Sequence, residues 1–260
     1  MISAQFIPSC DSQILLTGYG PASTKQLVLC VPGLFEELNL SRAVVAKLGQ
    51  YLSTRGTSFF QLDYAGTGDS QGELEDSTSQ IWLQNVLDAG AWLSQQGAGQ
   101  IILLGVRFGA LLQLHFQPQL HEALNIQGQI VWKPITSGKT LSNQLLRLKH
   151  TNHVLNGGEK VDWREKIRQG EVVEVAGYPI NESLLSSIEA LSINPESPLL
   201  SSLDWLELGA KVLPPAVGKF QKGWPDARFN AVDVQTFWQI PDIYTEPALH
   251  AVHEKIIGRL

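Results

Sequence analysis

Apolar runs, polar turns and amphipathic stretches alternate along most of the chain. Two apolar runs at residues 2–7 and 13–18 flank a polar turn, a pattern that predicts a β-hairpin. Further strands are predicted at residues 27–31, 58–63, 101–106, 129–133, 203–209 and 228–234. Helical patterns lie between them, at residues 40–54, 77–95, 108–116, 214–222 and 247–257. A hairpin followed by this alternation predicts an α/β fold with an eight-stranded, mostly parallel sheet and helices on both faces.

The alternation stops between Pro134 and Pro198, where no clear buried strand is found. Helical patterns at residues 140–150 and 181–191 flank a polar segment that contains two adjacent glycines. We therefore expect a core formed by residues 1–134 and 198–260, with a helical cap inserted at residues 135–197.

The composition excludes several classes of protein. The 260 residues are 43% hydrophobic and 17% charged, as in ordinary globular proteins, and the net charge of −6 argues against a nucleic-acid partner. The N-terminus has no secretory signal pattern, and the longest apolar runs are too short to span a bilayer.

Cys10 and Cys30 are too few for a disulfide framework and are expected to be small apolar strand residues. A cytoplasmic protein without a transmembrane segment is predicted, and a peripheral membrane contact stays open.

The pattern Gly105-x-Arg107-x-Gly109 joins a predicted buried strand to a predicted helix. This strand–turn–helix setting is where hydrolases with a G-x-S-x-G motif carry their nucleophilic serine. Arginine remains protonated in proteins and has no lone pair to offer, so Arg107 cannot attack a substrate.

The other positions of a catalytic triad are also empty. The strand at residues 203–209 is followed by Ala210, Lys211 and Val212, none of which is an acid. The last strand is followed by no histidine, since His250 and His253 fall inside the terminal helix. Triad chemistry is therefore expected to be absent.

Ligands of open parallel sheets bind beyond the carboxyl ends of the strands. Residues that follow the predicted strands are therefore candidates for a shared ligand-binding site: Phe35, Asn39, Arg42, Asp69, Ser70, Trp132, Lys133, Phe237 and Trp238. The aromatic members could equally be core residues.

Arg107 has two interpretations at this edge of the sheet. It could grip a carboxylate or phosphate of a ligand, because a helix N-terminus already favours anions. Alternatively it forms a buried ion pair with Glu36 or Glu37 and fills the former catalytic space. The two glutamates could act as acid and base, or they could simply complement the dipole of the helix that follows.

Other motifs are weaker. Gly66-x-Gly68 lacks the third glycine of a dinucleotide fingerprint, since Gln71 takes its place, and no Walker sequence is present. His150 and His153 have the spacing of one helix face, as do His250 and His253, but no cysteine or acid cluster supports a metal site. We expect no metal and no cofactor.

Short motifs in a fixed order run through nearly the whole chain. They are Phe35-Glu36-Glu37-x-Asn39-x-Ser41-Arg42, Asp63-x-x-Gly66-x-Gly68-Asp69-Ser70, Gly105-x-Arg107-x-Gly109-Ala110, Trp132-x-Pro134-x-x-x-Gly138, Leu146-Arg147, Ala176-Gly177-Tyr178-Pro179, Phe237-Trp238-Gln239 and Pro247-Ala248-Leu249. In these motifs the chain resembles the exosortase A system-associated hydrolase 2 family of the α/β-hydrolase superfamily. The resemblance implies the α/β-hydrolase fold and a bacterial cytoplasmic protein linked to exopolysaccharide production and to the sorting of PEP-CTERM proteins. It also implies that the arginine elbow is a family trait.

Two hypotheses for function follow. The first is an ester or thioester hydrolase acting on a saccharide-linked or lipid-linked substrate, with Arg107 as the electrophilic or anion-binding group and Glu36 or Glu37 as acid and base. The second is a non-catalytic pseudoenzyme that binds an anionic, saccharide- or lipid-linked ligand or a partner protein.

Overall fold

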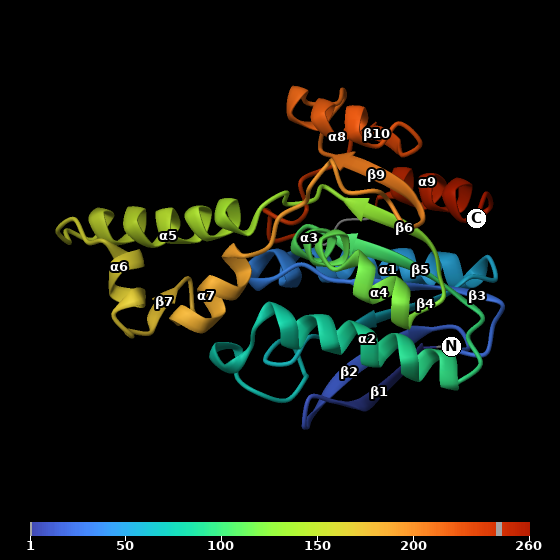
Figure 1. Cartoon of the computed structure of the whole chain (residues 1–260), viewed down its shortest axis with the longest axis horizontal. Helices are drawn as coiled ribbons and strands as arrows, with labels where there is room; N and C mark the ends of the chain where they lie inside the picture. Colours follow the sequence, from blue (N-terminus) through green and yellow to red (C-terminus); the bar gives the residue numbers. More distant parts are fainter. Residues whose placement is uncertain (1, 243–245) are drawn as a thin grey trace.

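The computed structural model describes residues 2–242 and 246–260 and contains an eight-stranded main sheet (Figure 1). Its strands follow in the order β1-β2-β4-β3-β5-β6-β9-β10. They are β1 (Ile2–Ser9), β2 (Ser12–Tyr19), β3 (Gln26–Val31), β4 (Ser58–Leu62), β5 (Gln100–Val106), β6 (Ile126–Trp132), β9 (Ser202–Leu208) and β10 (Arg228–Val232). The hairpin β1–β2 is antiparallel, as is the pairing of β2 with β4, and the other pairings are parallel. The predicted sheet is confirmed.

Helices cover both faces of the sheet. They are α1 (Phe35–Thr54), α2 (Ser79–Gln95), α3 (Phe108–His115), α4 (Gln117–Ala123), α8 (Gly218–Gly223) and α9 (Pro247–Ile257), with short 3₁₀ turns η1 (Leu74–Asp76) and η2 (Pro215–Val217). The sequence pattern did not predict α4, because Pro118 is typical of a helix end. Proline is nevertheless tolerated in the first turn of a helix, where Pro118 lies. It also placed the start of α1 at residue 40, whereas the helix begins at Phe35.

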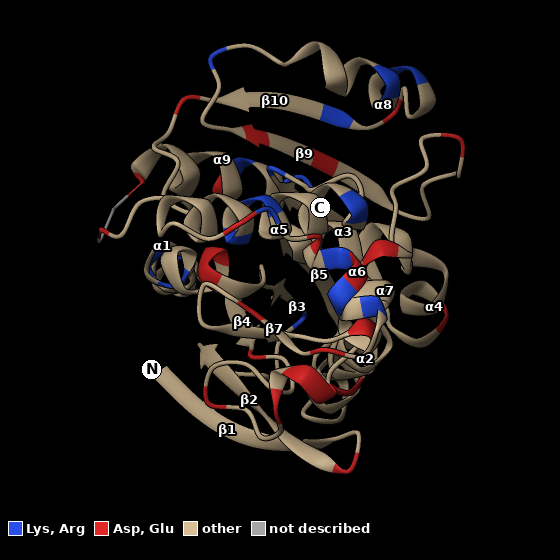
Figure 2. Cartoon of the chain, turned by 90° about the vertical axis from the view of Figure 1, so that its left-hand side faces the viewer, with Lys and Arg blue, Asp and Glu red and all other residues tan. Residues whose placement is uncertain are grey.

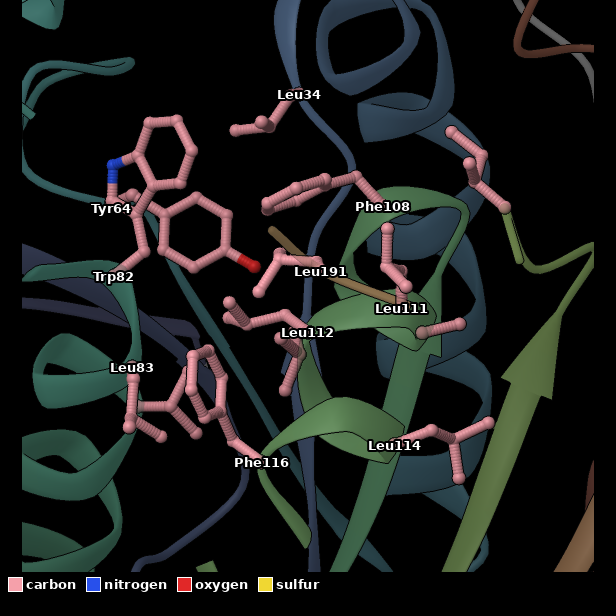
Figure 3. Close-up of a cluster of buried hydrophobic side chains, with 14 of the residues drawn as sticks. Leu34, Tyr64, Trp82, Leu83, Phe108, Leu111, Leu112, Leu114, Phe116 and Leu191 are labelled. Atoms are coloured by element: carbon pink, nitrogen blue, oxygen red, sulfur yellow. The ribbon is translucent and has the colours of Figure 1, made fainter. Parts of the chain in front are cut away.

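Side chains of β3 alternate between two hydrophobic clusters, one on each face of the sheet. Leu27, Leu29 and Val31 join the cluster beneath α2 and α3, whereas Val28 and Cys30 join the cluster beneath α1 and α9. Figure 3 shows part of the first cluster, in which the aromatic side chains of Trp82 on α2, Phe108 on α3 and Tyr64 after β4 lie together at the start of α3. The start of α3 is therefore anchored on a rigid apolar base.

A long insertion separates β6 from β9. It contains α5 (Gly138–Leu155), α6 (Trp163–Arg168), β7 (Val173–Val175), β8 (Tyr178–Ile180) and α7 (Glu182–Glu189), and α5 projects away from the sheet (Figure 1). The expectation that this stretch contains no strand is wrong, because β7 and β8 form a separate antiparallel hairpin. Strands of three residues are too short to give a periodic signal, and Ala176 and Gly177 make their tight turn with positive φ.

The two cysteines lie in different environments. Cys30 is buried in β3, as expected. Cys10 was expected in a strand but lies exposed in the turn between β1 and β2 with a φ of 48°. Within residues 2–242 and 246–260, no helix has the length and apolar character needed to cross a membrane.

Candidate functional site

Arg107 occupies a sharp elbow between β5 and α3. It precedes the first residue of α3 and has φ 54° and ψ −107°, a conformation that favours glycine. Two glycines make the turn possible, since a Cβ on Gly105 would lie 2.5 Å from the Cα of Ala110 and one on Gly109 would lie 2.0 Å from the carbonyl oxygen of Val31. The backbone therefore has the strained geometry that displays a nucleophile in hydrolases, with a guanidinium in its place.

The guanidinium of Arg107 is bound on several sides. Its Nη2 donates to Oε1 of Glu37 at 2.8 Å, and its Nε lies 3.1 Å from both carboxylate oxygens of that residue. Its Nη1 donates to the backbone carbonyl of Lys133 at 2.8 Å. The Cζ atom also lies 5.5 Å from the ring centre of Trp238, within the range of a cation–π contact.

This ion pair lies in a shielded position. The Arg107 side chain is 11% exposed and that of Glu37 is 22% exposed. The Glu37 carboxylate offsets the positive charge of Arg107, and the backbone carbonyl of Lys133 accepts a hydrogen bond from Nη1. The guanidinium therefore has little net charge left to attract an anionic ligand. Of the two interpretations of Arg107, the structure matches the buried ion pair.

Glu36 points to a different partner. Its Oε2 accepts a hydrogen bond at 3.1 Å from the hydroxyl of Tyr178 at the start of β8, and Asn39 donates to the same hydroxyl oxygen at 3.0 Å. Phe35 packs edge-on against the Tyr178 ring, with ring centres 5.3 Å apart. Burial, together with the neighbouring Glu36 carboxylate, raises the pKa of Tyr178 to about 12. These contacts tie the β7–β8 hairpin to the start of α1.

A second ion pair lies beside the elbow. Lys133, which has a φ of 42°, pairs through Nζ with Oε1 of Glu207 on β9. The other carboxylate oxygen of Glu207 accepts a hydrogen bond from the indole of Trp205 at 3.1 Å. Sequence reasoning missed Glu207 because it searched for an acid after β9 and not within it. Two acids, Asp204 and Glu207, inside an otherwise mostly apolar strand were the available signal.

All four aromatic candidates belong to the buried core, Phe35 on one face of the sheet and Trp132, Phe237 and Trp238 on the other. Trp132 is fully buried and donates from its indole nitrogen to Nε2 of His253 at 2.9 Å, and Phe237 packs against it with ring centres 5.9 Å apart. Burial lowers the pKa of His253 to about 4, which keeps the ring neutral and suited to a structural role. Trp238 differs from these residues because it lies against the guanidinium of Arg107.

Two polar candidates stabilise the loop after β4, and a third is exposed there. Arg42 pairs with Asp63 at 3.0 Å, and the hydroxyl of Ser70 donates to the backbone oxygen of Asp63 at 2.7 Å. The backbone nitrogen of Leu15 donates to Ser70 in turn, whereas the neighbouring Asp69 is exposed. None of these hydrogen bonds and ion pairs of the described residues involves Arg107.

A cavity of about 270 Å³ lies between α1, the loop after β4 and the hairpin β7–β8. Its walls include the side chains of Phe35, Leu38, Leu74 and Tyr178, and the backbone of Gly66 and Gly68 faces it. The walls are mostly apolar with a few polar groups, as in small-molecule sites. Among the described residues, no group of three or more His, Cys, Asp or Glu side chains is placed to hold a metal ion.

The sheet order, the flanking helices and the elbow define the class of protein: the chain has the α/β-hydrolase fold. A structure of Est1E from Butyrivibrio proteoclasticus with bound ferulic acid superimposes with a TM-score of 0.71 at 15% identity over 98% of both chains. Mouse α/β hydrolase domain-containing protein 10 gives 0.63 at 16% identity over 99% of both chains. The thioesterase domain from the curacin biosynthetic pathway gives 0.60 at 14% identity, covering 97% of this chain and 99% of that domain.

Sequence similarity to known proteins is limited to part of the chain. The mitochondrial palmitoyl-protein thioesterase ABHD10 of Mus musculus is 31% identical over 88 residues, which are 34% of this chain and 28% of that protein. The rat protein is 30% identical over the same lengths. The chain thus matches little more than a quarter of these relatives. No known protein-family profile matches it. These comparisons show the α/β-hydrolase fold for this chain, and about a third of its length is similar in sequence to mitochondrial palmitoyl-protein thioesterases.

Proposed function

We propose that this protein is a pseudoenzyme of the α/β-hydrolase superfamily that binds a ligand without triad hydrolysis. The observation that carries the proposal is the closed elbow, in which Glu37 and the carbonyl of Lys133 bind the guanidinium of Arg107. An attacking group needs a lone pair and a base beside it. The elbow offers a permanent cation beside a carboxylate that neutralises it.

The cavity beside Phe35 and Tyr178 is the ligand site in this proposal. Its volume of about 270 Å³ and its apolar walls suit a short acyl chain or a small aromatic acyl group. The hairpin that carries Tyr178 would act as the cap over this ligand, with residues 135–197 forming a unit distinct from the core. Asn39 and Thr67 supply polar groups at its rim.

The cellular setting follows from the sequence resemblance alone. We place the protein in the bacterial cytoplasm, in a system that makes exopolysaccharide or sorts PEP-CTERM proteins. An acyl or saccharide-linked ligand of that system, or a partner protein that presents one, would occupy the cavity.

Ester or thioester hydrolysis is the second candidate, supported by the partial similarity to palmitoyl-protein thioesterases. In that reaction Glu37 would take a proton from water as the water oxygen attacks the acyl carbonyl, and Arg107 would stabilise the resulting oxyanion. The acyl–oxygen or acyl–sulfur bond would then break, and Glu37 would return the proton to the leaving alcohol or thiol.

Turnover of chromogenic esters and acyl-CoA thioesters distinguishes the two candidates. The pseudoenzyme predicts that wild-type protein and the variants Arg107→Ala and Glu37→Gln are equally inactive, while wild type still shows saturable binding of a non-hydrolysable acyl probe. Filling the cavity by Thr67→Phe should abolish that binding. Turnover that is lost in Glu37→Gln but kept in the matched control Glu36→Gln would refute the pseudoenzyme and establish the hydrolase.

A further inference from the structure

A second cavity, of about 380 Å³, lies in the insertion between β6 and β9 and is lined by residues from positions 143 to 164, none of which belongs to the elbow. One wall is the face of α5 that carries Asn143, Arg147 and His150, at the helical spacing of four and three residues. The opposite wall is the segment at residues 160–164, which leads into α6. Figure 2 looks at this end of the molecule and shows Lys and Arg positions along α5 and α6.

The charges around this cavity are unbalanced. Arg147 and Lys160 stand on opposite walls, and among the described residues neither of them has a carboxylate within ion-pair distance. Six of the eight arginines of the chain are ion-paired, so a free Arg147 is unusual in a protein that has more acids than bases. The carboxylate in the lining belongs to Asp162, whose Oδ1 accepts a hydrogen bond at 3.1 Å from the backbone nitrogen of Glu165.

The base of the cavity is fixed in place. Arg164 donates to Asn143 at 2.8 Å and pairs with Glu189, which offsets its charge. Trp163 is held between His153, whose ring centre is 5.0 Å away and perpendicular, and Lys149, whose Nζ is 5.1 Å from the indole. The indole nitrogen of Trp163 is buried and has no acceptor in the described part of the chain.

We propose that this cavity binds the phosphate monoester of a small organic molecule. A phosphate monoester carries close to two negative charges at neutral pH, which matches the two unpaired cations on its walls. The volume is far larger than a phosphate ion needs, so the organic part of the ligand would fill the rest against Leu146 and Trp163. The site is independent of the elbow, where Glu37 already neutralises the arginine.

Isothermal titration calorimetry of the whole chain tests this site. The probes are glucose 1-phosphate, glycerol 3-phosphate and AMP, with glucose, glycerol and adenosine as their neutral counterparts and glucuronate and inorganic phosphate as further anions. We expect at least one ester to bind in preference to its neutral counterpart and to both other anions. Removing one charged hydrogen-bond donor, by Arg147→Ala or Lys160→Ala, should weaken that binding roughly tenfold or more.

Arg168→Ala is the matched control, because Arg168 is an exposed arginine of the same insertion without an ion pair within the described residues and does not line the cavity. It should leave affinity within about twofold of wild type, since an exposed charge that does not contact the ligand interacts with it only weakly through water.

Four results overturn the proposal. They are no binding of any ester at millimolar concentration, equal binding of a neutral counterpart, equal binding of glucuronate or inorganic phosphate, and an equal loss in Arg168→Ala and Arg147→Ala. All variants should keep the circular dichroism spectrum of wild type, because the substituted side chains lie on the surface of the insertion. None of these results depends on whether the elbow is catalytic.

Discussion

Replacing Arg107 by methionine tests whether the elbow is held by its ion pair. Methionine keeps most of the aliphatic length against Trp238 and has the same Cβ, so the cost of the positive φ is unchanged and the charge is isolated. The substitution removes the hydrogen bonds to Glu37 and to the carbonyl of Lys133 and leaves the Glu37 carboxylate without its cation.

The size of the loss follows from the burial of the pair. Breaking a fully buried ion pair costs about 3–5 kcal/mol, because the remaining charge stays desolvated. The Glu37 side chain is 22% exposed, so water can hydrate it in part, and we expect a loss of about 2–3 kcal/mol in the free energy of unfolding. Glu37→Gln leaves an acceptor in place and should cost about 1–2 kcal/mol.

Urea unfolding of the two single variants and of the double variant gives the coupling energy. The double variant should be more stable than the sum of the single losses predicts, by about 1–2 kcal/mol, since neither charge is then left alone. Strictly additive losses, or an Arg107→Met variant as stable as wild type, would show that the pair merely occupies space. The m-value must stay constant for the comparison to hold.

Three further predictions concern parts of the fold away from the elbow. Burial lowers the pKa of His253 to about 4, so the neutral ring stabilises the fold fully above pH 6.5, and this contribution is lost as the pH falls from 6.5 towards 4. The loss arises because a protonated ring cannot accept the hydrogen bond from the Trp132 indole. The variant His253→Gln should therefore flatten the curve of unfolding free energy against pH between these two values. Tyr178→Phe removes the hydroxyl that joins the β7–β8 hairpin to α1, so amide hydrogen exchange should accelerate in the hairpin while β5 stays protected. Asp204→Asn weakens the pairs that this fully buried carboxylate makes with Arg228 and Arg259, and should lower the melting temperature by several degrees and make the segment after α9 more susceptible to limited proteolysis.

Much of the fold could be predicted from the sequence, because buried strands are continuous apolar runs and amphipathic helices repeat their apolar residues every three to four positions. All eight strands of the main sheet lie where apolar runs predicted them. Elements without such a signal were missed, namely α4, whose second residue is Pro118, the six-residue helix α6 and the short hairpin β7–β8. Local rules fail there because a few tertiary contacts decide the structure.

The candidate site was only partly predictable. The elbow and its arginine follow from two glycines, but the choice between Glu36 and Glu37 depends on the phase of α1. Successive helix residues point about 100° apart, so a start at Phe35 directs one carboxylate to Tyr178 and the other to Arg107. The predicted helix began at residue 40, so both glutamates lay outside it and their directions could not be predicted.

The two glycines of the elbow are required whatever stands between them. The chain passes so close to Ala110 and Val31 that no larger residue fits at positions 105 and 109, while position 107 imposes no chemistry of its own. A search that takes the glycine spacing alone as a sign of a nucleophile will therefore also collect chains whose middle residue cannot attack a substrate, and the identity of that residue has to be read separately.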